Sequence, residues 1–246
     1  MSRRTTRVAL AALAASSLLL VTACTGDEGK DKAADKPAAP PKPKVLSEAQ
    51  ARTVLVKPAD IAPGWKLKPD YVIDVMDPAQ YTFGKADKPA CQPFVDLINT
   101  GRVLTDYKVT VQQVIGDPGD KTNVAQDVSG YADAKAVQAA VQSVADGVAG
   151  CAEFGSTAEK KPVKVRVKPL KMAAQGEQST SLEIVFEENG ADASTYTFES
   201  AIVRVGANVT YLHNNLGEGG ERNQKGFAQA VAKAAENLKK VTPAAG

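Results

Sequence analysis

The chain has 246 residues, a formal net charge of +2, three cysteines and few aromatic residues (5%). Three arginines lie within the first seven positions, and the remaining chain has 27 Lys and Arg against 28 Asp and Glu. A chain this close to neutral is not expected to bind nucleic acid through its overall charge. About 200 residues follow the N-terminal segments, which is enough for one domain with a substantial core.

Residues 1–23 have the parts of a secretory signal peptide: a basic start, an uncharged apolar stretch over residues 8–21, and small residues before a cysteine. The sequence LVTAC at residues 20–24 resembles a bacterial lipobox, which directs cleavage before the cysteine and attachment of a thioether-linked lipid. We therefore expect Cys24 to be lipidated, with acyl chains such as palmitate. Two acyl chains hold a protein stably on a bilayer.

A transmembrane anchor and an ordinary signal peptide are the alternatives for this segment. A spanning helix needs about 20 apolar residues, whereas this uncharged run is shorter and contains Ser16 and Ser17. An ordinary signal peptide would not require a cysteine at this position. We expect a lipid-anchored protein on the extracytoplasmic face of the cell membrane.

Residues 24–45 are predicted to be the lipidated cysteine and a flexible linker rich in Pro, Lys and Ala. Four prolines lie within residues 37–43, and the segment has no apolar periodicity. Its lysines are largely offset by acidic residues. A disordered stalk is therefore favoured over a segment that binds lipid headgroups.

Residues 46–242 are predicted to form the folded domain. Ser47 and Gln50 make a capping-box pattern at the start of a short helix, Asp133 is the N-cap of a longer amphipathic helix, and Asn189-Gly190 predicts a tight hairpin. Helices are predicted over residues 47–56, 91–99, 133–150 and 221–240, and strands over 66–74, 107–112, 123–131, 163–170, 181–188, 194–205 and 208–213. Hairpin-linked strands between helices indicate an α+β fold, a single domain whose mainly antiparallel sheet packs with helices.

Cys91 and Cys151 are the two cysteines beyond Cys24. Export to an oxidising compartment favours a disulfide between them. A metal site is the alternative, but two cysteines need further ligands and His213 is the chain's one histidine. We expect the disulfide, and no metal or other cofactor.

Several short sequence segments occur in an order that is also found in a known domain family. The domain opens with Leu-Ser-Glu-Ala at residues 46–49, continues through Lys-Pro-Ala-Cys at residues 88–91, and has Gly-Cys-Ala at residues 150–152 after an Ala- and Val-rich helix. A hairpin series and an Ala-rich helix close it. This arrangement resembles the PknH-like extracellular sensor domain of actinobacterial cell envelopes, which occurs outside receptor Ser/Thr kinases and in freestanding lipoproteins.

The resemblance implies an α+β domain with a cleft for an unidentified extracellular ligand. The family usually has a second cysteine pair in the later strands, and this chain has no cysteine there. The geometry of the cleft is therefore not implied by the resemblance. With no kinase domain in the sequence, we expect any signalling to require a partner.

The sequence contains no Gly-x-Ser-x-Gly nucleophile motif and no Gly-rich phosphate-binding loop. His213 would have to be the base of any Ser-His-Asp triad, but it follows the alternation of Val209 and Tyr211 and is more typical of a buried structural histidine. Glu187 and Glu188 are adjacent on a strand and point to opposite faces, so they cannot act as a paired acid and base.

Two further features are weak candidates for ligand binding. Lys164, Arg166 and Lys168 alternate along one face of a predicted strand and would form a basic stripe for anionic envelope polymers or headgroups. A solvated edge strand protected by its lysines is the favoured interpretation, with Glu183 and Glu187 as cross-strand partners. Trp65, the one tryptophan, would line a cleft or, more typically, fill the core.

Together these observations predict a non-enzymatic, membrane-anchored extracytoplasmic lipoprotein whose domain binds or senses a ligand or protein partner of the envelope. A cell-wall-directed hydrolase or transferase and a structural partner in an envelope complex are the alternatives. An enzyme would show convergent carboxylates or His213 in a polar cleft. A binding module would show an apolar cleft with few polar groups.

Overall fold

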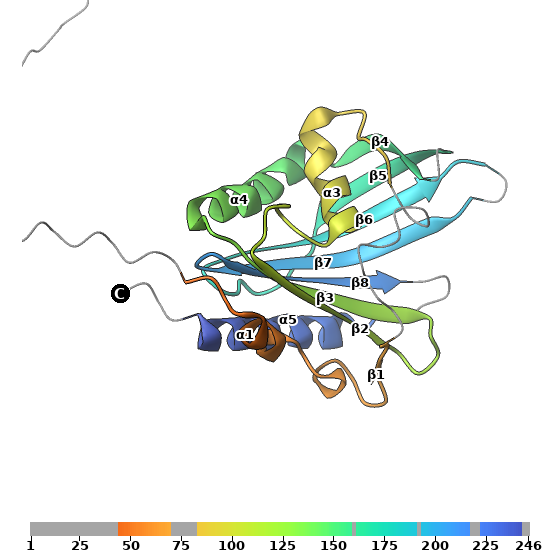
Figure 1. Ribbon diagram of the computed structural model, residues 1–246. Coiled ribbons are helices and arrows are strands. Elements are labelled where there is room, and N and C mark those ends of the chain that lie inside the picture. Colours follow the sequence, from red (N-terminus) through yellow and green to blue (C-terminus); the bar gives the residue numbers. More distant parts are fainter. Residues whose placement is uncertain (1–43, 70–82, 159–160, 191–192, 217–221, 243–246) are drawn as a thin grey trace, which may run out of the picture. The chain divides into compact units, whose positions relative to one another are not determined.

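Eight antiparallel strands form one sheet in the computed structural model of the chain (Figure 1). The structure describes residues 44–69, 83–158, 161–190, 193–216 and 222–242. The predicted signal peptide, Cys24 and most of the predicted linker lie outside the described residues. The strands are β1 (Lys66–Leu67), β2 (Val109–Gly116), β3 (Thr122–Gly130), β4 (Glu153–Ala158), β5 (Lys161–Pro169), β6 (Gln178–Glu188), β7 (Thr195–Val205) and β8 (Asn208–Leu216).

The order of the strands across the sheet is β1-β2-β3-β8-β7-β6-β5-β4, so the last strand pairs with the third. That pairing sets Ala125 opposite His213 and Asp127 opposite Tyr211. The helices are α1 (Glu48–Val54), α3 (Gln92–Thr100), α4 (Ala134–Gly150) and α5 (Gln224–Val241), with short 3-10 turns η1 (Pro58–Asp60) and η2 (Pro89–Cys91). The architecture is therefore the predicted α+β domain with an antiparallel sheet.

Helices cover both faces of the sheet (Figure 1). On one face, α3 and α4 pack on a cluster that includes Val165, Ile184, Phe186 and Ile202. On the other face, α5 packs against β7 and β8, and α1 packs against α5, β2 and β3. Burial on both sides explains why β7 and β8 are nearly continuously buried and have no solvent-exposed face.

Local sequence accounts for the helix boundaries. The Ser47 hydroxyl accepts the Gln50 backbone N–H, and the Gln50 side chain accepts the Ser47 N–H, which confirms the capping box. Asp133 accepts two backbone N–H groups at the start of α4. The last helix begins three residues later than predicted, because the Asn223 side chain is its N-cap.

One side chain, that of Asn208, joins both ends of the described domain. Its amide nitrogen donates to the Lys44 carbonyl at 3.1 Å and to the Thr242 hydroxyl at 3.4 Å. Its amide oxygen accepts the Leu46 N–H at 3.2 Å. The segment that enters the fold and the segment that leaves α5 therefore meet at the β7–β8 turn.

Two predictions about the strands were incomplete. Strand β4 was not predicted, since Glu153–Ala158 is a short edge strand that contains a glycine. The Gly155 N–H donates to the Asp87 carboxylate, and the Asp87 N–H donates to the Gly155 carbonyl. Glycine suits this close contact, because an added Cβ would lie 2.8 Å from an Asp87 carboxylate oxygen. Of the predicted strand over residues 66–74, the described residues contain β1 at Lys66–Leu67, and residues 70–74 lie outside the described part of the chain.

The Asn189-Gly190 hairpin joins β6 and β7 as predicted, but not as a two-residue turn. Among the described residues, the last cross-strand hydrogen bond at this end joins the Glu188 N–H to the Ser194 carbonyl, with five positions between them. The β7–β8 turn has two residues, and Gly206 adopts the positive φ of 60° that the turn requires. Within the described part of the chain, no helix is long and apolar enough to cross a membrane.

A disulfide joins Cys91 to Cys151, as predicted. It ties η2, just before α3, to the end of α4, and both cysteines are buried. The two helices that cover this face of the sheet are thus covalently linked.

Replacing both cysteines with alanine should lower the free energy of unfolding by about 2–4 kcal/mol, because the bridge closes a loop of 60 residues and restricts the unfolded chain. Urea unfolding of the double variant and of the parent protein would measure the difference. The Cys24→Ala variant, which keeps the bridge, is the control. Equal stabilities, together with free thiols at both positions in the parent protein, would contradict the assignment.

Candidate functional site

A partly enclosed pocket lies between the C-terminal end of α3 and the face of the sheet that α3 and α4 cover. Residues 98–101 line one side, and Gln112, residues 125–127, Tyr211 and His213 line the sheet side. The space inside it that a water-sized molecule can occupy is about 10 Å³, which is room for about one water. The pocket exists because β8 lies beside β3 and brings His213 next to residues 125–127.

Gly101 shapes one wall of this pocket. It ends α3 with a left-handed φ of 67°, and its N–H bonds the Leu97 carbonyl. A Cβ at this position would lie 3.5 Å from an Asp127 carboxylate oxygen. That distance is an ordinary contact, so the positive φ and not lack of space favours glycine here, and it turns the chain toward Arg102.

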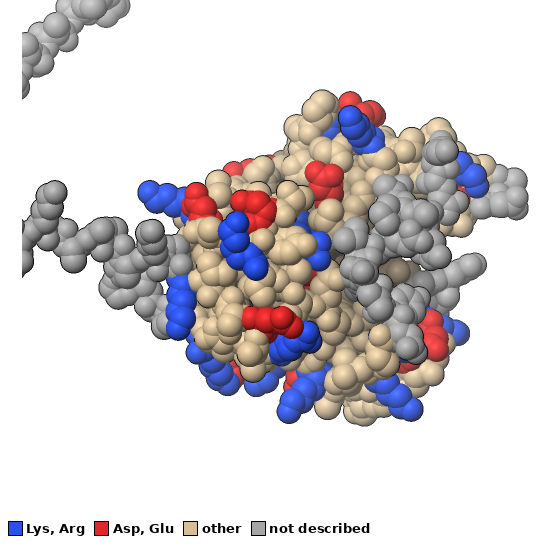
Figure 2. Space-filling view, viewed as in Figure 1, with Lys and Arg blue, Asp and Glu red and all other residues tan. Residues whose placement is uncertain are grey.

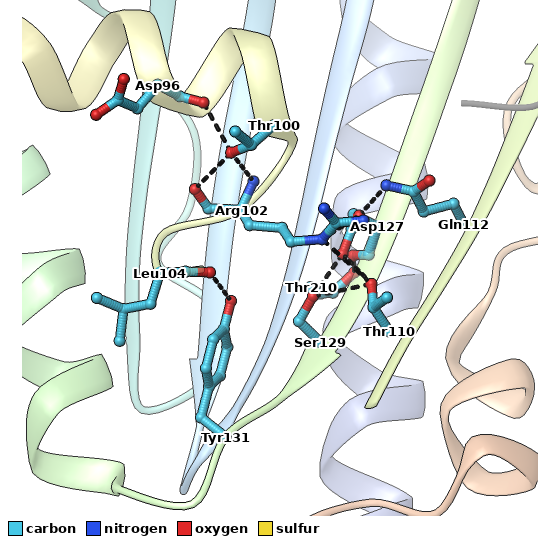
Figure 3. A network of polar contacts seen from close by, with 10 residues as sticks. All are labelled: Asp96, Thr100, Arg102, Leu104, Thr110, Gln112, Asp127, Ser129, Tyr131 and Thr210. Atoms are coloured by element: carbon cyan, nitrogen blue, oxygen red, sulfur yellow. Dashed lines mark hydrogen bonds and ion pairs between the residues drawn. The ribbon is translucent and has the colours of Figure 1, made fainter. Parts of the chain in front are cut away.

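Asp127 is the centre of a polar network on β3 (Figure 3). Its Oδ1 accepts the Ser129 hydroxyl at 2.6 Å and the Thr110 hydroxyl at 3.1 Å. Its Oδ2 accepts the Gln112 amide and lies 3.6 Å from Arg102 Nε. A carboxylate has about four lone-pair positions, so each has a partner here.

Arg102 and Asp127 form an ion pair that is almost fully buried, with side-chain exposures of 8% and 5%. The guanidinium also lies over the Tyr107 ring, 4.6 Å from its centre. Burial raises the pKa of the Asp127 carboxyl above its usual value, although the hydrogen bonds and Arg102 oppose this effect. The ion pair holds the segment after α3 against the sheet.

His213 is buried, as predicted, with 8% of its surface exposed. Its ring lies 5.4 Å from that of Tyr211 and 6.1 Å from that of Phe198. Burial lowers the pKa of His213 to about 4, so the imidazole is neutral at pH 7. Its Nδ1 is buried and has no hydrogen-bond partner in the described part of the chain.

Tyr211, the neighbouring wall of the pocket, has no free polar group. Its hydroxyl lies 3.0 Å from the Ser200 hydroxyl, and burial raises its pKa well above the usual value. The ring therefore provides an apolar surface beside His213.

The weak ligand-binding candidates do not converge on one site. His213 lies on the face of the sheet that α3 and α4 cover. Trp65 packs, partly buried, against the cluster beneath α5 on the other face. Lys164, Arg166 and Lys168 also lie on that other face, because the valines that alternate with them pack in the cluster under α4.

Each member of the basic stripe has an acidic partner, but β5 is not the edge strand that was predicted, because β4 pairs with it on the side away from β6. Lys164 lies 3.6 Å from Glu153, Arg166 pairs with Glu187, and Lys168 lies 2.7 Å from Glu183. Acidic and basic side chains are likewise interspersed over the face of the molecule in Figure 2.

Arg222 joins the same group, 2.6 Å from Glu183 and 3.3 Å from Glu199, two buried carboxylates that face each other on β6 and β7. Burial opposes the ionised form of Glu183, but its bonds to Lys168 and Arg222 dominate and lower its pKa. This pairing fixes the start of α5 on the sheet.

Sequence reasoning missed Asp127, Arg102 and Gln112. Residues 123–131 are predicted as a strand, and Asp127 occupies a position where its side chain must be buried against α3. An acidic residue within a strand that is buried on both faces is a signal of a paired charge. The sequence does not show that the partner comes from a loop 25 positions earlier.

The shifted pKa of His213 leads to a prediction about stability. The unfolded chain binds the imidazole proton near pH 6.5 and the folded protein only near pH 4, so acidification favours unfolding. The free energy of unfolding should therefore fall by about 2 kcal/mol between about pH 6.5 and about pH 5 through this residue.

Urea unfolding of the parent protein and of His213→Phe at both pH values would measure this effect. The variant should lack this part of the pH dependence, and contributions from carboxylates such as Asp127 cancel in the comparison. An identical pH dependence in the two proteins would rule out a buried neutral histidine.

Comparisons with known proteins agree with the fold. Residues 37–233 match the model of a family described as the PknH-like extracellular domain. Among solved structures, the extracellular domain of PknH from Mycobacterium tuberculosis superposes with a TM-score of 0.53 at 14% sequence identity, over 80% of this chain and 98% of that one. A search of curated proteins found no match. Because the family model covers most of the chain, this protein belongs to the PknH-like extracellular domain family.

Proposed function

We propose that this protein is a lipid-anchored extracytoplasmic lipoprotein whose domain binds a ligand that reaches the pocket beside His213, as a sensing module without catalytic activity. Membership of a family defined by an extracellular domain supports the location. The lipobox-like sequence before Cys24 supports the anchor.

The observation that carries the ligand-binding proposal is the unpartnered Nδ1 of His213 in the wall of the pocket. A buried polar atom without a hydrogen bond costs about 1–3 kcal/mol. A ligand that satisfies this atom recovers that free energy on binding. The pocket has room for about one water-sized group, so a small part of a ligand, such as one hydroxyl group, is what can reach this atom.

The same residues are poorly suited to catalysis. A histidine with a pKa near 4 is a weak general base at neutral pH. Asp127 would be the neighbouring carboxylate, but its oxygens are already bonded to Ser129, Thr110, Gln112 and Arg102. Binding without chemistry is therefore favoured over the hydrolase or transferase alternative.

Cys24→Ala removes the residue that would carry the lipid, and we expect the protein to move from the membrane fraction to the medium. Fractionation of native cells followed by immunoblotting would detect the shift. Thr25→Ser is a matched control, since this substitution changes the residue after the cysteine and leaves Cys24 in place. Unchanged membrane retention of Cys24→Ala would contradict lipid anchoring.

His213→Phe keeps the aromatic volume that packs against Phe198 and Tyr211 but removes both ring nitrogens. Small molecules extracted from the natively produced protein should include a compound that is depleted at least tenfold in this variant. Mass spectrometry of the extracts would identify it, and Asn215→Ala, two residues further along β8, is the control. A ligand retained equally by the parent protein and by His213→Phe would show that binding occurs elsewhere.

A further inference from the structure

We propose that the end of the domain at which the chain enters and leaves the fold docks on a bilayer surface with anionic phospholipid headgroups. This inference rests on the lipid anchor of the proposed function and does not involve the pocket beside His213. Four exposed lysines and one exposed tyrosine form the surface, which we call the basic end: Lys44, Tyr107, Lys108, Lys135 and Lys239.

Hydrogen bonds bring two of these lysines together from distant parts of the sequence. The Lys108 N–H donates to the Gly130 carbonyl at 2.7 Å, and Gly130 is the last residue of β3, opposite Asn208. The Lys44 carbonyl accepts the Asn208 amide at 3.1 Å. Both lysines therefore lie at the end of the sheet that contains the β7–β8 turn, which is at the left of Figure 1.

Two helices bring the other lysines to the same end. Lys135 lies in the first turn of α4, which begins four residues after β3 ends. Lys239 lies in the last turn of α5, three residues before Thr242, whose hydroxyl accepts a hydrogen bond from Asn208. Lys and Arg side chains accordingly line the left edge of the described molecule in Figure 2.

The basic end has an excess of available positive charge. Its four lysines form no ion pair with any described residue. Asp133 is used as the N-cap of α4, which leaves Asp106 as the exposed aspartate beside Lys108. The glutamates at this end are each paired with a base: Glu48 with Arg52, Glu177 with Arg204, and Glu236 with Lys240.

Tyr107 adds an apolar component that fits a bilayer. It is 38% exposed, and Leu67 is the other large apolar side chain that is exposed in the described part of the chain. Tyrosine is enriched at membrane–water interfaces, because its ring enters the headgroup layer while its hydroxyl stays hydrated. A soluble anionic polymer has no such layer, so an exposed tyrosine next to Lys108 favours the bilayer as the partner.

The proposed anchor brings this end of the domain to the membrane. Lys44 follows Cys24 by 20 positions, a length of chain that reaches at most about 70 Å. A tether of this kind gives an effective concentration on the order of millimolar. Each lysine near an anionic membrane strengthens binding about fivefold. Four lysines that bind too weakly to recruit the free protein are therefore sufficient to dock the tethered domain.

The test attaches the chain from residue 24 onward, which contains every described residue, to vesicles through a maleimide phospholipid that reacts with Cys24. This cysteine is available for the reaction because the disulfide occupies Cys91 and Cys151. The chemical tether does not depend on native lipidation, so a failure of the lipid anchor and a failure of this inference are distinguishable. Mass spectrometry measures the acetylation rate of each lysine on vesicles of phosphatidylcholine, with and without about one third phosphatidylglycerol.

We expect acetylation of the lysines at the basic end to slow at least threefold on the anionic vesicles, because docking covers them. High salt should restore the rate, since it screens the attraction. Three exposed lysines at the opposite end of the sheet should change little: Lys66, Lys121 and Lys161.

Two triple variants reverse three charges each, at the basic end or at the opposite end: K108E/K135E/K239E and K66E/K121E/K161E. Protection of Lys44 on anionic vesicles should be lost in the first variant and kept in the second. If the first variant fails to fold, the two kinds of vesicle still decide the question with the parent protein.

Equal acetylation of the basic end on both kinds of vesicle would overturn the inference, as would protection of Lys44 that survives the first triple variant. Soluble polyphosphate, added to protein on neutral vesicles, is the probe for an anionic polymer. Protection by polyphosphate equal to that by anionic vesicles would assign the surface to a polymer and would also overturn the inference.

Discussion

The burial of one carboxylate, that of Asp127, is the constraint on which the site depends. An unpaired charge at this depth would cost several kcal/mol, so the fold must supply donors from more than one element. Thr110 and Gln112 come from β2, Ser129 from β3 itself, and Arg102 from the segment after α3. Because Arg102 must reach the sheet, the end of α3 lies over β3 and forms one wall of the pocket.

Strand β3 connects the two layers of helices through adjacent side chains. Gln126, next to Asp127, points to the opposite face, where its amide oxygen accepts the Val56 N–H at 2.8 Å and its amide nitrogen donates to the Val54 carbonyl at 3.3 Å. Asp127 thus holds the chain after α3, and Gln126 holds the end of α1. Because hydrogen bonds are directional, fully bonded polar groups fix the positions of these two segments more closely than apolar packing does.

Much of the fold could be predicted because its signals are local. The capping box at Ser47, the valine spacing in α4 and the alternation in β5 each occur within a few residues. Strand β4 could not be predicted, since it depends on long-range contacts such as that of Gly155 with Asp87. His213 was singled out as the one histidine, but its surroundings depend on the pairing of β8 with β3 across more than 80 positions.

The contacts of Asn208 have a topological consequence. Lys44 and Thr242 both bond to this one side chain, so the polypeptide enters and leaves the fold at nearly the same point. A domain with adjacent ends can be carried inside a loop of another protein, and its natural ends can be joined and new ones opened elsewhere, without disturbing the sheet. Circular permutation at the β6–β7 loop should therefore preserve the architecture, and the domain should fold when it is inserted into another protein.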